Sequence, residues 1–514
     1  MNLFARKTNV SKNTKENYIR RNNQRKLNNS QEYRSARFAF GVSLVIALTA
    51  GALSIDYSTG AVKTSVLIFA LIFLAEGVFE YIISNILKKK LINDEPITRG
   101  LRLTGYISIL TLLTGNIFSA ISGFNRIHEE KTIEYTLVSW SIIISVTILM
   151  VSLLNLYKDH VSKHFTLGLI ILGIMIVFLS ITLVLVTKYV TKLDVDRKML
   201  PIAIILVLTI VSGNAFSFLA GIVMLRKMHQ KEKEISIEWV DIIIRLFRNN
   251  MAVIGMFFVI FLLSLSIFSL LTFDYAVAVE NNYSAILKKP SLEYPFGTDN
   301  YGRCVFTRIV FGSRISLIVG VISTLAPIIV GGLLGAVSGY YGKVTDNVIM
   351  RSLDILYAVP SMLLAIAIVA AFGANTVNLI LALSVGSIPS YARTVRATVM
   401  SLSNSEFVEA AKACGAKDFT IIIKHIIPNS LAPVIVRATM GIGTAVLSTS
   451  SLSYLGLGVE PHIPEWGNVL KAGNSYLETA PHLAIFPGIA IVLIVLAFNF
   501  FGDGLRDATD PKLK

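Results

Sequence analysis

The stretch SNSEFVEAAKACGAKDFTIIIKHIIPN, residues 403–429, is polar, has helical periodicity and lies between two long hydrophobic runs. Ser403 and Glu406 have the spacing of a capping box, which predicts the start of a first helix. One apolar face of that helix is expected to carry Phe407, Ala410, Ala411 and Cys414. Gly415 follows where the backbone needs a residue that tolerates positive φ, so we expect this helix to end there.

A second helix is predicted directly after Gly415. Its apolar face would carry Phe419, Ile422, Ile423 and Ile426, and Pro428 would mark its end. Together the two helices form what we call the knob segment, residues 403–429, a bent helical pair on the surface of a membrane protein. From periodicity alone, a plain loop with two surface helices remains the alternative.

Composition places the whole chain in a membrane. Of its 514 residues, 54% are hydrophobic and only 15% are charged, and uncharged runs of bilayer-crossing length recur along it. A soluble enzyme with this composition would expose too much apolar surface. The first 37 residues are polar and basic, so we expect no cleavable signal peptide.

The basic residues are concentrated between the hydrophobic runs. The net charge of +15 raises the possibility of nucleic-acid binding, but most Lys and Arg fall in loops that one topology places in the cytoplasm. Both chain ends are then cytoplasmic, and we expect no nucleic-acid partner. Cys304 and Cys414 would lie on opposite sides of the membrane, and we find no metal-ligand spacing.

The sequence predicts an all-α polytopic protein of about 12 spans in two blocks. Residues 1–37 are predicted to form a basic cytoplasmic tail that is attracted to anionic lipid. Residues 38–225 form a first block of unknown role, and residues 226–250 a basic linker with an amphipathic interfacial helix at 235–248. Residues 251–514 form the second block. The expected spans are 38–55, 64–87, 103–124, 134–156, 165–187, 199–225, 251–273, 313–338, 353–372, 376–398, 432–457 and 483–503.

Loop charge assigns a side to each connection in the first block. Loops 88–102 and 157–164 are predicted inside, and loops 125–133 and 188–198 outside. Two acidic residues, Glu76 and Glu80, share one face of the second span. Charges in hydrocarbon are costly and often functional, but we expect these two to face neighbouring helices or an interface.

The knob segment carries a family resemblance. Glu409-Ala410-Ala411, three residues, Gly415 and then Ile426-Ile427-Pro428 resemble the "EAA" loop of bacterial ABC importer permeases. His425 and Asn429 make it similar to the C-type subunit of the oligopeptide/dipeptide/nickel family, with Ile427 where that family usually has Leu. The resemblance implies a MetI-like type I permease fold for the second block and docking of the knob segment into a cytoplasmic ATPase.

Four further stretches, within residues 240–514, resemble the same family. Gly297, Asp299, Arg303 and Arg314 match an external run in which Cys304 replaces the usual Asp. Asp346, Arg351 and Asp354 follow the turn Gly339-Tyr340-Tyr341-Gly342 and are expected to form a cytoplasmic ion-pair set. Residues 453–467 match a motif at the outer mouth, and residues 486–511 match the last span and tail.

No catalytic chemistry is visible in the sequence. It has no phosphate-binding G-x-x-x-x-G-K-[ST] run, no Ser/His/Asp elbow and no H-E-x-x-H, so we expect no catalytic residue and no metal or cofactor bound by this chain. The resemblance implies that two ABC ATPase subunits hydrolyse ATP with Mg²⁺. It also implies a second permease subunit and an extracytoplasmic substrate-binding protein.

The implied function is ATP-driven import across the bacterial cell membrane, with oligopeptides or dipeptides as the first candidate cargo and nickel as the alternative. Thr444, Ser448 and Ser451 fit either pore lining or close helix packing. Two other classes stay open: an ion-driven secondary transporter with two six-span halves, and a sensor role for residues 1–225.

Overall fold

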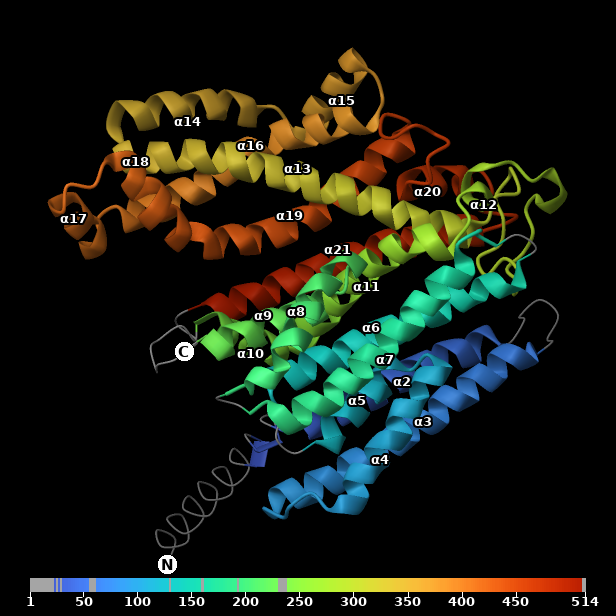
Figure 1. Ribbon diagram of the computed structural model, residues 1–514. Helices are drawn as coiled ribbons and strands as arrows, with labels where there is room; N and C mark the ends of the chain where they lie inside the picture. The colour runs from blue at the N-terminus through green and yellow to red at the C-terminus, as the bar shows by residue number, and fades with distance from the viewer. Residues whose placement is uncertain are drawn as a thin grey trace, which may run out of the picture. The chain divides into compact units, whose positions relative to one another are not determined.

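The computed structural model describes residues 23–24, 26–27, 30–54, 62–128, 131–158, 161–191, 194–229 and 238–510, and the predictions for residues 1–22 lie outside them. The regular secondary structure of the described residues is helical, apart from two isolated bridges, Val190 to Val195 and Thr298 to Cys304 (Figure 1).

The helices that precede the second block run from α2 to α10 (Figure 1). In chain order they are α2 (Gln31–Leu53), α3 (Thr64–Ile92), α4 (Arg99–Leu110), η1 (Thr111–Thr114), α5 (Ile117–Ile127), α6 (Ile133–Leu153), η2 (Leu154–Tyr157), α7 (Phe165–Tyr189), η3 (Arg197–Met199), α8 (Leu200–Leu208), η4 (Thr209–Ser212), α9 (Ala215–His229) and α10 (Glu238–Arg248). Helix α10 occupies most of the predicted amphipathic segment.

The helices of the second block run from α11 to α21. Its elements are α11 (Asn250–Thr272), α12 (Ala276–Val279), η5 (Tyr283–Ala285), α13 (Val305–Tyr341), α14 (Lys343–Ala358), α15 (Ser361–Phe372), α16 (Thr376–Leu402), α17 (Glu406–Ala413), α18 (Asp418–Ile421), η6 (Ile422–Ile426), α19 (Ile427–Leu455), α20 (Trp466–Asn474) and α21 (His482–Thr509).

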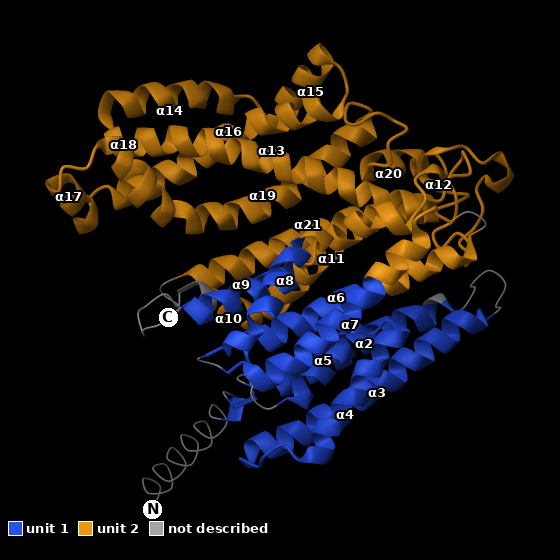
Figure 2. Cartoon of the chain, in the orientation of Figure 1, with its two compact units in different colours: residues 1–147, 172–210, 215–232 blue, residues 148–171, 211–214, 233–514 orange. Residues whose placement is uncertain are grey.

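The chain divides into two compact units, shown in Figure 2. Unit 1 comprises residues 1–147, 172–210 and 215–232, and unit 2 comprises residues 148–171, 211–214 and 233–514. These units divide the chain differently from the predicted blocks, since residues 148–171 and 211–214 of the first block fall in unit 2. Each unit is described separately below.

The predicted count of about 12 spans is not confirmed. Within the described residues, 8 helices are long and apolar enough to cross a membrane, or up to 9 if α14 and α15, which bend by 80° at their junction, form one broken span. The predicted span 376–398 corresponds to α16, which is not among those 8 helices. The predicted spans 103–124 and 199–225 are not single helices.

Both of those stretches are helical hairpins. Residues 103–124 divide between α4 and α5, which pack against each other, and residues 199–225 divide between α8 and α9. A 3₁₀ turn and a glycine with positive φ, Gly115 at 86° and Gly213 at 76°, reverse the chain in each. Positive φ is readily reached only by glycine, so these positions determine the reversal.

The two hairpins have related sequences. Residues 110–119, LTLLTGNIFS, and residues 208–217, LTIVSGNAFS, align without a gap. In the first hairpin a Cβ on Gly123 would stand 2.4 Å from the Gly105 carbonyl oxygen, and in the second a Cβ on Gly221 would stand 2.7 Å from that of Ala203. The same register of close helix packing therefore occurs twice, which indicates a tandem repeat of two spans followed by a hairpin.

Because residues 103–124 and 199–225 each turn back as hairpins, the loops that follow them lie at a different end of the helices than predicted. Lys131, which follows the first hairpin, contacts Glu32, and Lys26 pairs with Asp94 at 2.5 Å. The described residues of loops 88–102 and 125–133 therefore share one end of unit 1 and do not lie at opposite ends. Lys227, after the second hairpin, pairs with Glu134 at 2.6 Å and donates to the Thr191 carbonyl, so Thr191 lies at that end too.

The acidic pair in α3 faces neighbouring helices. Glu80 is fully buried, and its carboxylate accepts two 2.9 Å hydrogen bonds from the Arg126 guanidinium and further bonds from Ser108 and Ser122. Glu76 accepts from the Thr114 hydroxyl and the Asn116 amide at the tip of the first hairpin. The acidic pair thus fixes the first hairpin against α3.

A stripe of glycines joins α13 to α16 in unit 2. Cβ atoms on Gly331, Gly335 and Gly339 would stand 2.6, 2.2 and 2.8 Å from the carbonyl oxygens of Ile388, Ala392 and Arg396. Both sets repeat every four residues, so the two helices meet backbone to backbone over two turns. Small residues permit such contact where hydrophobic burial gives little drive for helix association.

Candidate functional site

The knob segment has the predicted bend but different boundaries. Helix α17 ends at Ala413. Gly415 has φ of 80°, and no atom lies within 4 Å of the place a Cβ would occupy, so glycine serves backbone geometry there and not packing. The predicted capping box is wrong. Ser403 is the C-cap of α16, and Ser405 precedes α17 without a side-chain cap.

Most of the predicted apolar face of α17 is not the face that packs on the rest of the chain. Val408 is fully buried and Ala411 packs beside it, whereas Phe407, Ala410 and Cys414 are exposed. In the second helix Ile422 and Ile426 are buried, while Phe419 and Ile423 are exposed. The buried residues attach the knob segment to α13, α16 and α19. Glu409 is exposed. The exposed apolar side chains Phe407, Phe419 and Ile423 define what we call the outer face of the knob segment.

Pro428 does not end the second helix, contrary to the prediction. Residues 418–455 form one continuous helical stretch, and Pro428 lies in the first turn of α19. The turn before it, η6, is π-helical. The backbone nitrogen of a proline has no hydrogen to donate, and the proline ring crowds the preceding turn. A wider π-helical turn accommodates the proline without breaking the helix.

Tyr340 connects the knob segment to the C-terminal end of α13. Its hydroxyl donates to an Asp418 carboxylate oxygen at 2.8 Å, and the Lys412 ammonium lies 5.1 Å from the centre of its ring. Both helices of the knob segment are thereby held by one side chain.

The predicted set of Asp346, Arg351 and Asp354 is only partly correct. The Asp346 carboxylate accepts two 2.5 Å hydrogen bonds from Arg396, and Asp354 accepts one at 2.7 Å from Arg393, so both partners are on α16. Arg351 is exposed and lies 3.9 Å from Asp354. The ion pairs therefore connect α14 to α16 instead of closing on α14 alone.

The external run forms a tight, buried turn. Gly297 has φ of 74°, and the Asp299 carboxylate accepts from the Arg303 side chain at 2.8 Å and from the backbone of Tyr301 and Arg303. Arg314 is exposed. Phe296 stacks on Phe486 of α21 with ring centres 4.0 Å apart. This turn packs beside the N-terminal ends of α13 and α21.

Lys158 corrects another loop prediction. Its ammonium donates to the Thr307 hydroxyl at 2.7 Å and lies 5.5 Å from the Phe273 ring centre. Lys158 therefore lies beside the start of α13, at the end of unit 2 that carries the loop predicted to be extracytoplasmic, and not at the end that carries the knob segment. Burial lowers the pKa of Lys158, and the neighbouring Cys304 thiol partly offsets that effect.

Glu465 joins three elements at the same end. Its carboxylate accepts from Ser316 on α13 at 3.2 Å, from Ser450 on α19 at 2.9 Å, and from the backbone of Gly467 at the start of α20 at 2.7 Å. The next residue, Trp466, donates from its indole to the Ile309 carbonyl at 2.9 Å. Burial raises the pKa of Glu465, and these donors offset part of the rise.

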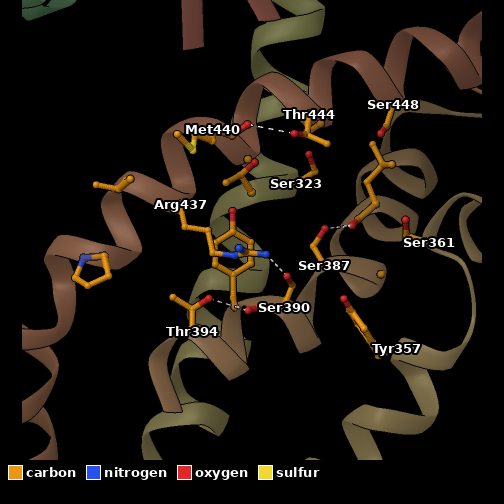
Figure 3. Close-up of a pocket in the computed structure, with 18 of the residues that line it drawn as sticks. Ser323, Tyr357, Ser361, Ser387, Ser390, Thr394, Arg437, Met440, Thr444 and Ser448 are labelled. Atoms are coloured by element: carbon orange, nitrogen blue, oxygen red, sulfur yellow. Dashed lines mark hydrogen bonds between the residues drawn. The ribbon is translucent and has the colours of Figure 1, made fainter. Parts of the chain in front are cut away.

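A large cavity opens among α13, α14, α16, α19 and α21, with a volume of about 1000 Å³ (Figure 3). Hydroxyl groups line much of its wall, including those of Ser323, Ser387, Ser390, Thr444 and Ser448. Of the three residues predicted as possible pore lining, Thr444 and Ser448 face this cavity. Ser451 is not among its lining residues.

Taken together, these features define a multi-pass membrane protein in which a surface helical pair is fixed to helices around a cavity that several hydroxyl groups line. Comparison with known proteins gives the family. The family model of the binding-protein-dependent transport system inner membrane component matches residues 331–514, and that of the N-terminal transmembrane domain of oligopeptide transport permease C matches residues 238–290.

Two relatives are matched over most of their own length. The chain is 46% identical to a dipeptide transport system permease protein of Alkalihalophilus pseudofirmus, over 54% of this chain and 90% of the relative. It is 41% identical to a glutathione transport system permease protein of Pectobacterium atrosepticum, over 55% and 94%. The chain therefore belongs to the ABC importer permeases of the peptide/nickel family, which are membrane subunits and not enzymes.

A solved structure adds little to this assignment. The inward-facing MetNI methionine ABC transporter matches 40% of this chain and 97% of its own, with 19% identity and a TM-score of 0.33.

Several features escaped the sequence analysis. The hairpins had a signal in the repeated Gly-Asn pairs at 115–116 and 213–214. Arg437, which lines the cavity, had one as an arginine within an otherwise apolar run. Glu465 lay in a recognised motif without an assigned contact. Lys158 had no signal, because its partner Thr307 is 149 residues away.

Proposed function

We propose that this chain is one of two permease subunits of an ATP-driven importer for small peptides. The names of its dipeptide and glutathione relatives support a peptide cargo. The cavity, at about 1000 Å³, is at the upper end of the size range of small-molecule sites and is large enough for a short peptide.

The observation that carries the mechanism is the two-sided knob segment. Its inner face is buried against α13, α16 and α19, while Phe407, Phe419 and Ile423 remain exposed on its outer face. Exposed apolar clusters of this kind mark protein interfaces. An ATPase that binds the outer face would move the knob segment as a rigid body, and α16 and α19 with it.

Motion of α16 and α19 would then change which side of the membrane the cavity faces. Glu409 either stabilises the bent pair or meets a cation on the ATPase. ATP and Mg²⁺ bind the ATPase subunits in this scheme, and an extracytoplasmic binding protein delivers the peptide to the outer end.

The test is co-expression of the full chain with candidate ATPases and a second permease subunit, followed by purification and reconstitution with a binding protein. We expect a stable complex whose ATP-dependent uptake accepts peptides. Uptake of nickel and not of peptides would show that nickel is the cargo. Transport by this chain alone, driven by an ion gradient, would contradict the proposal and favour a secondary transporter.

A further inference from the structure

One face of α19 forms a wall of the cavity. Arg437, Met440, Gly441, Thr444 and Ser448 all line it, at the spacing of a single helical face (Figure 3). Four of the five are small, hydroxylated or flexible. Arg437 is the exception, because it brings a permanent positive charge to this wall.

The guanidinium of Arg437 is held by α16. It donates to the Ser390 hydroxyl and lies 5.6 Å from the centre of the Tyr391 ring. The Tyr391 hydroxyl in turn requires Gly441, since a Cβ there would stand 2.3 Å from the hydroxyl oxygen. The sequence thus provides a rigid aromatic platform, a hydroxyl and a glycine that position one cation.

The Arg437 guanidinium has more N–H donors than its contacts within the described residues use. An arginine offers five N–H donors, and the contact with Ser390 is the one hydrogen bond found for its side chain within the described residues. Among those residues, no carboxylate lies within ion-pair distance of Arg437, and the side chain is exposed to the cavity. A charge within a membrane-spanning helix is costly unless it has a partner or a function.

We propose that Arg437 binds the carboxylate of the peptide cargo as the cargo passes through the cavity. A planar guanidinium matches a carboxylate in two parallel hydrogen bonds. The surrounding hydroxyls can accept and donate to peptide groups of any sequence, so the anionic terminus is recognised while the side chains are not. This inference rests on the proposed function, because it requires that peptides enter this cavity.

The experiment uses the complete reconstituted importer and two matched cargos, alanyl-alanine and its C-terminal amide. For each cargo, the uptake rate of a variant is divided by that of the wild type at saturating binding protein. This ratio cancels the preference of the binding protein. The variants are Arg437→Gln, Arg437→Lys and Lys343→Gln, the last of which removes an exposed charge outside the cavity.

We expect Arg437→Gln to lower the ratio for the free acid by roughly 10- to 100-fold, the usual cost of losing a charge-assisted hydrogen bond. The ratio for the amide should change much less. Arg437→Lys should recover part of the free-acid rate, and Lys343→Gln should affect both cargos equally. Equal losses for acid and amide in Arg437→Gln would overturn the inference and assign Arg437 to a partner subunit or to packing.

The wild-type complex separates this inference from the proposed function. If the wild type takes up neither cargo nor any other peptide, the proposed function fails. If the wild type takes up alanyl-alanine and Arg437→Gln leaves its preference for acid over amide unchanged, only the role of Arg437 fails.

Discussion

Gly335 of α13 lies against Ala392 of α16 so closely that a Cβ on the glycine would stand 2.2 Å from the alanine carbonyl oxygen. Gly335→Ala should therefore force the two helices apart and destabilise unit 2 by about 1–3 kcal/mol, the usual cost of overpacking. Thermal unfolding of the purified protein in nanodiscs measures the effect.

The neighbouring Gly332 provides the matched control. A Cβ there would meet its nearest atom, in Val395, at 3.9 Å. Gly332→Ala should leave the melting temperature unchanged or raise it, since alanine favours helix over glycine by about 1 kcal/mol. Similar losses in the two variants would show that helix packing does not depend on the glycine stripe.

Gly415 is expected to matter for coupling and not for insertion. A left-handed backbone costs a non-glycine residue about 1–2 kcal/mol, and a β-branched residue is the least tolerant. Gly415→Ile should abolish peptide uptake and its coupling to ATP hydrolysis, while membrane insertion stays normal because the site is open. Gly415→Asn, which tolerates this conformation, should retain most uptake. Wild-type uptake in Gly415→Ile would contradict the lever mechanism.

The buried pair of Glu80 and Arg126 should behave non-additively. Glu80→Gln leaves the Arg126 charge buried without its partner, and such losses typically cost about 3–5 kcal/mol. Combining Glu80→Gln with Arg126→Met removes the stranded charge and should restore part of that stability. Chemical unfolding of the single and double variants measures the coupling. A double variant that is less stable than either single variant would argue against this explanation.

The stability of the part of unit 2 around α20 should be sensitive to pH through Glu465. Burial raises the pKa of this carboxyl in the folded protein above its unfolded value. Its contribution to stability is therefore complete below the unfolded pKa and is lost as the pH rises through the folded pKa. We expect the melting temperature to fall over that interval in the wild type and to be flatter in Glu465→Gln. Identical pH profiles for the two proteins would refute this assignment.

The corrected position of loop 157–164 can be tested by thiol labelling. Lys163 is exposed, and neighbouring Lys158 contacts Thr307 at the start of α13, whereas the knob segment contacts Tyr340 at the other end of that helix. A cysteine at Lys163 should react with a membrane-impermeant reagent from the same side as a cysteine at Lys289. Native Cys414 should react only from the opposite side. Labelling of Lys163→Cys together with Cys414 would restore the original topology.

The predictions made from the sequence were most accurate where residues close together in the chain determine the structure. Gly415 was expected to reverse the backbone, and it has φ of 80°. The match of Glu409 to Pro428 with a known motif led to the correct family. These inferences needed only the order of residues along one short stretch.

Long-range packing was harder to foresee. The run of residues 199–225 is apolar enough for a span, and only the position of Gly213 distinguishes a hairpin from a straight helix. Likewise, Asp346 has Arg351 nearby in sequence but binds Arg396, fifty residues away. Hydropathy and spacing contain no information about which partner is nearer in space.

The continuity of α19 has a consequence for how small a driving movement can be. Its 29 residues span about 43 Å at 1.5 Å per residue, from the π-helical turn to the Gly456 cap. If the end beside the knob segment acts as a pivot, a tilt of about 5° displaces the far end by about 4 Å, more than the diameter of a water molecule. Because the displacement grows with distance along the helix, a slight rotation at one surface of the bilayer would be enough to open or close a passage at the other.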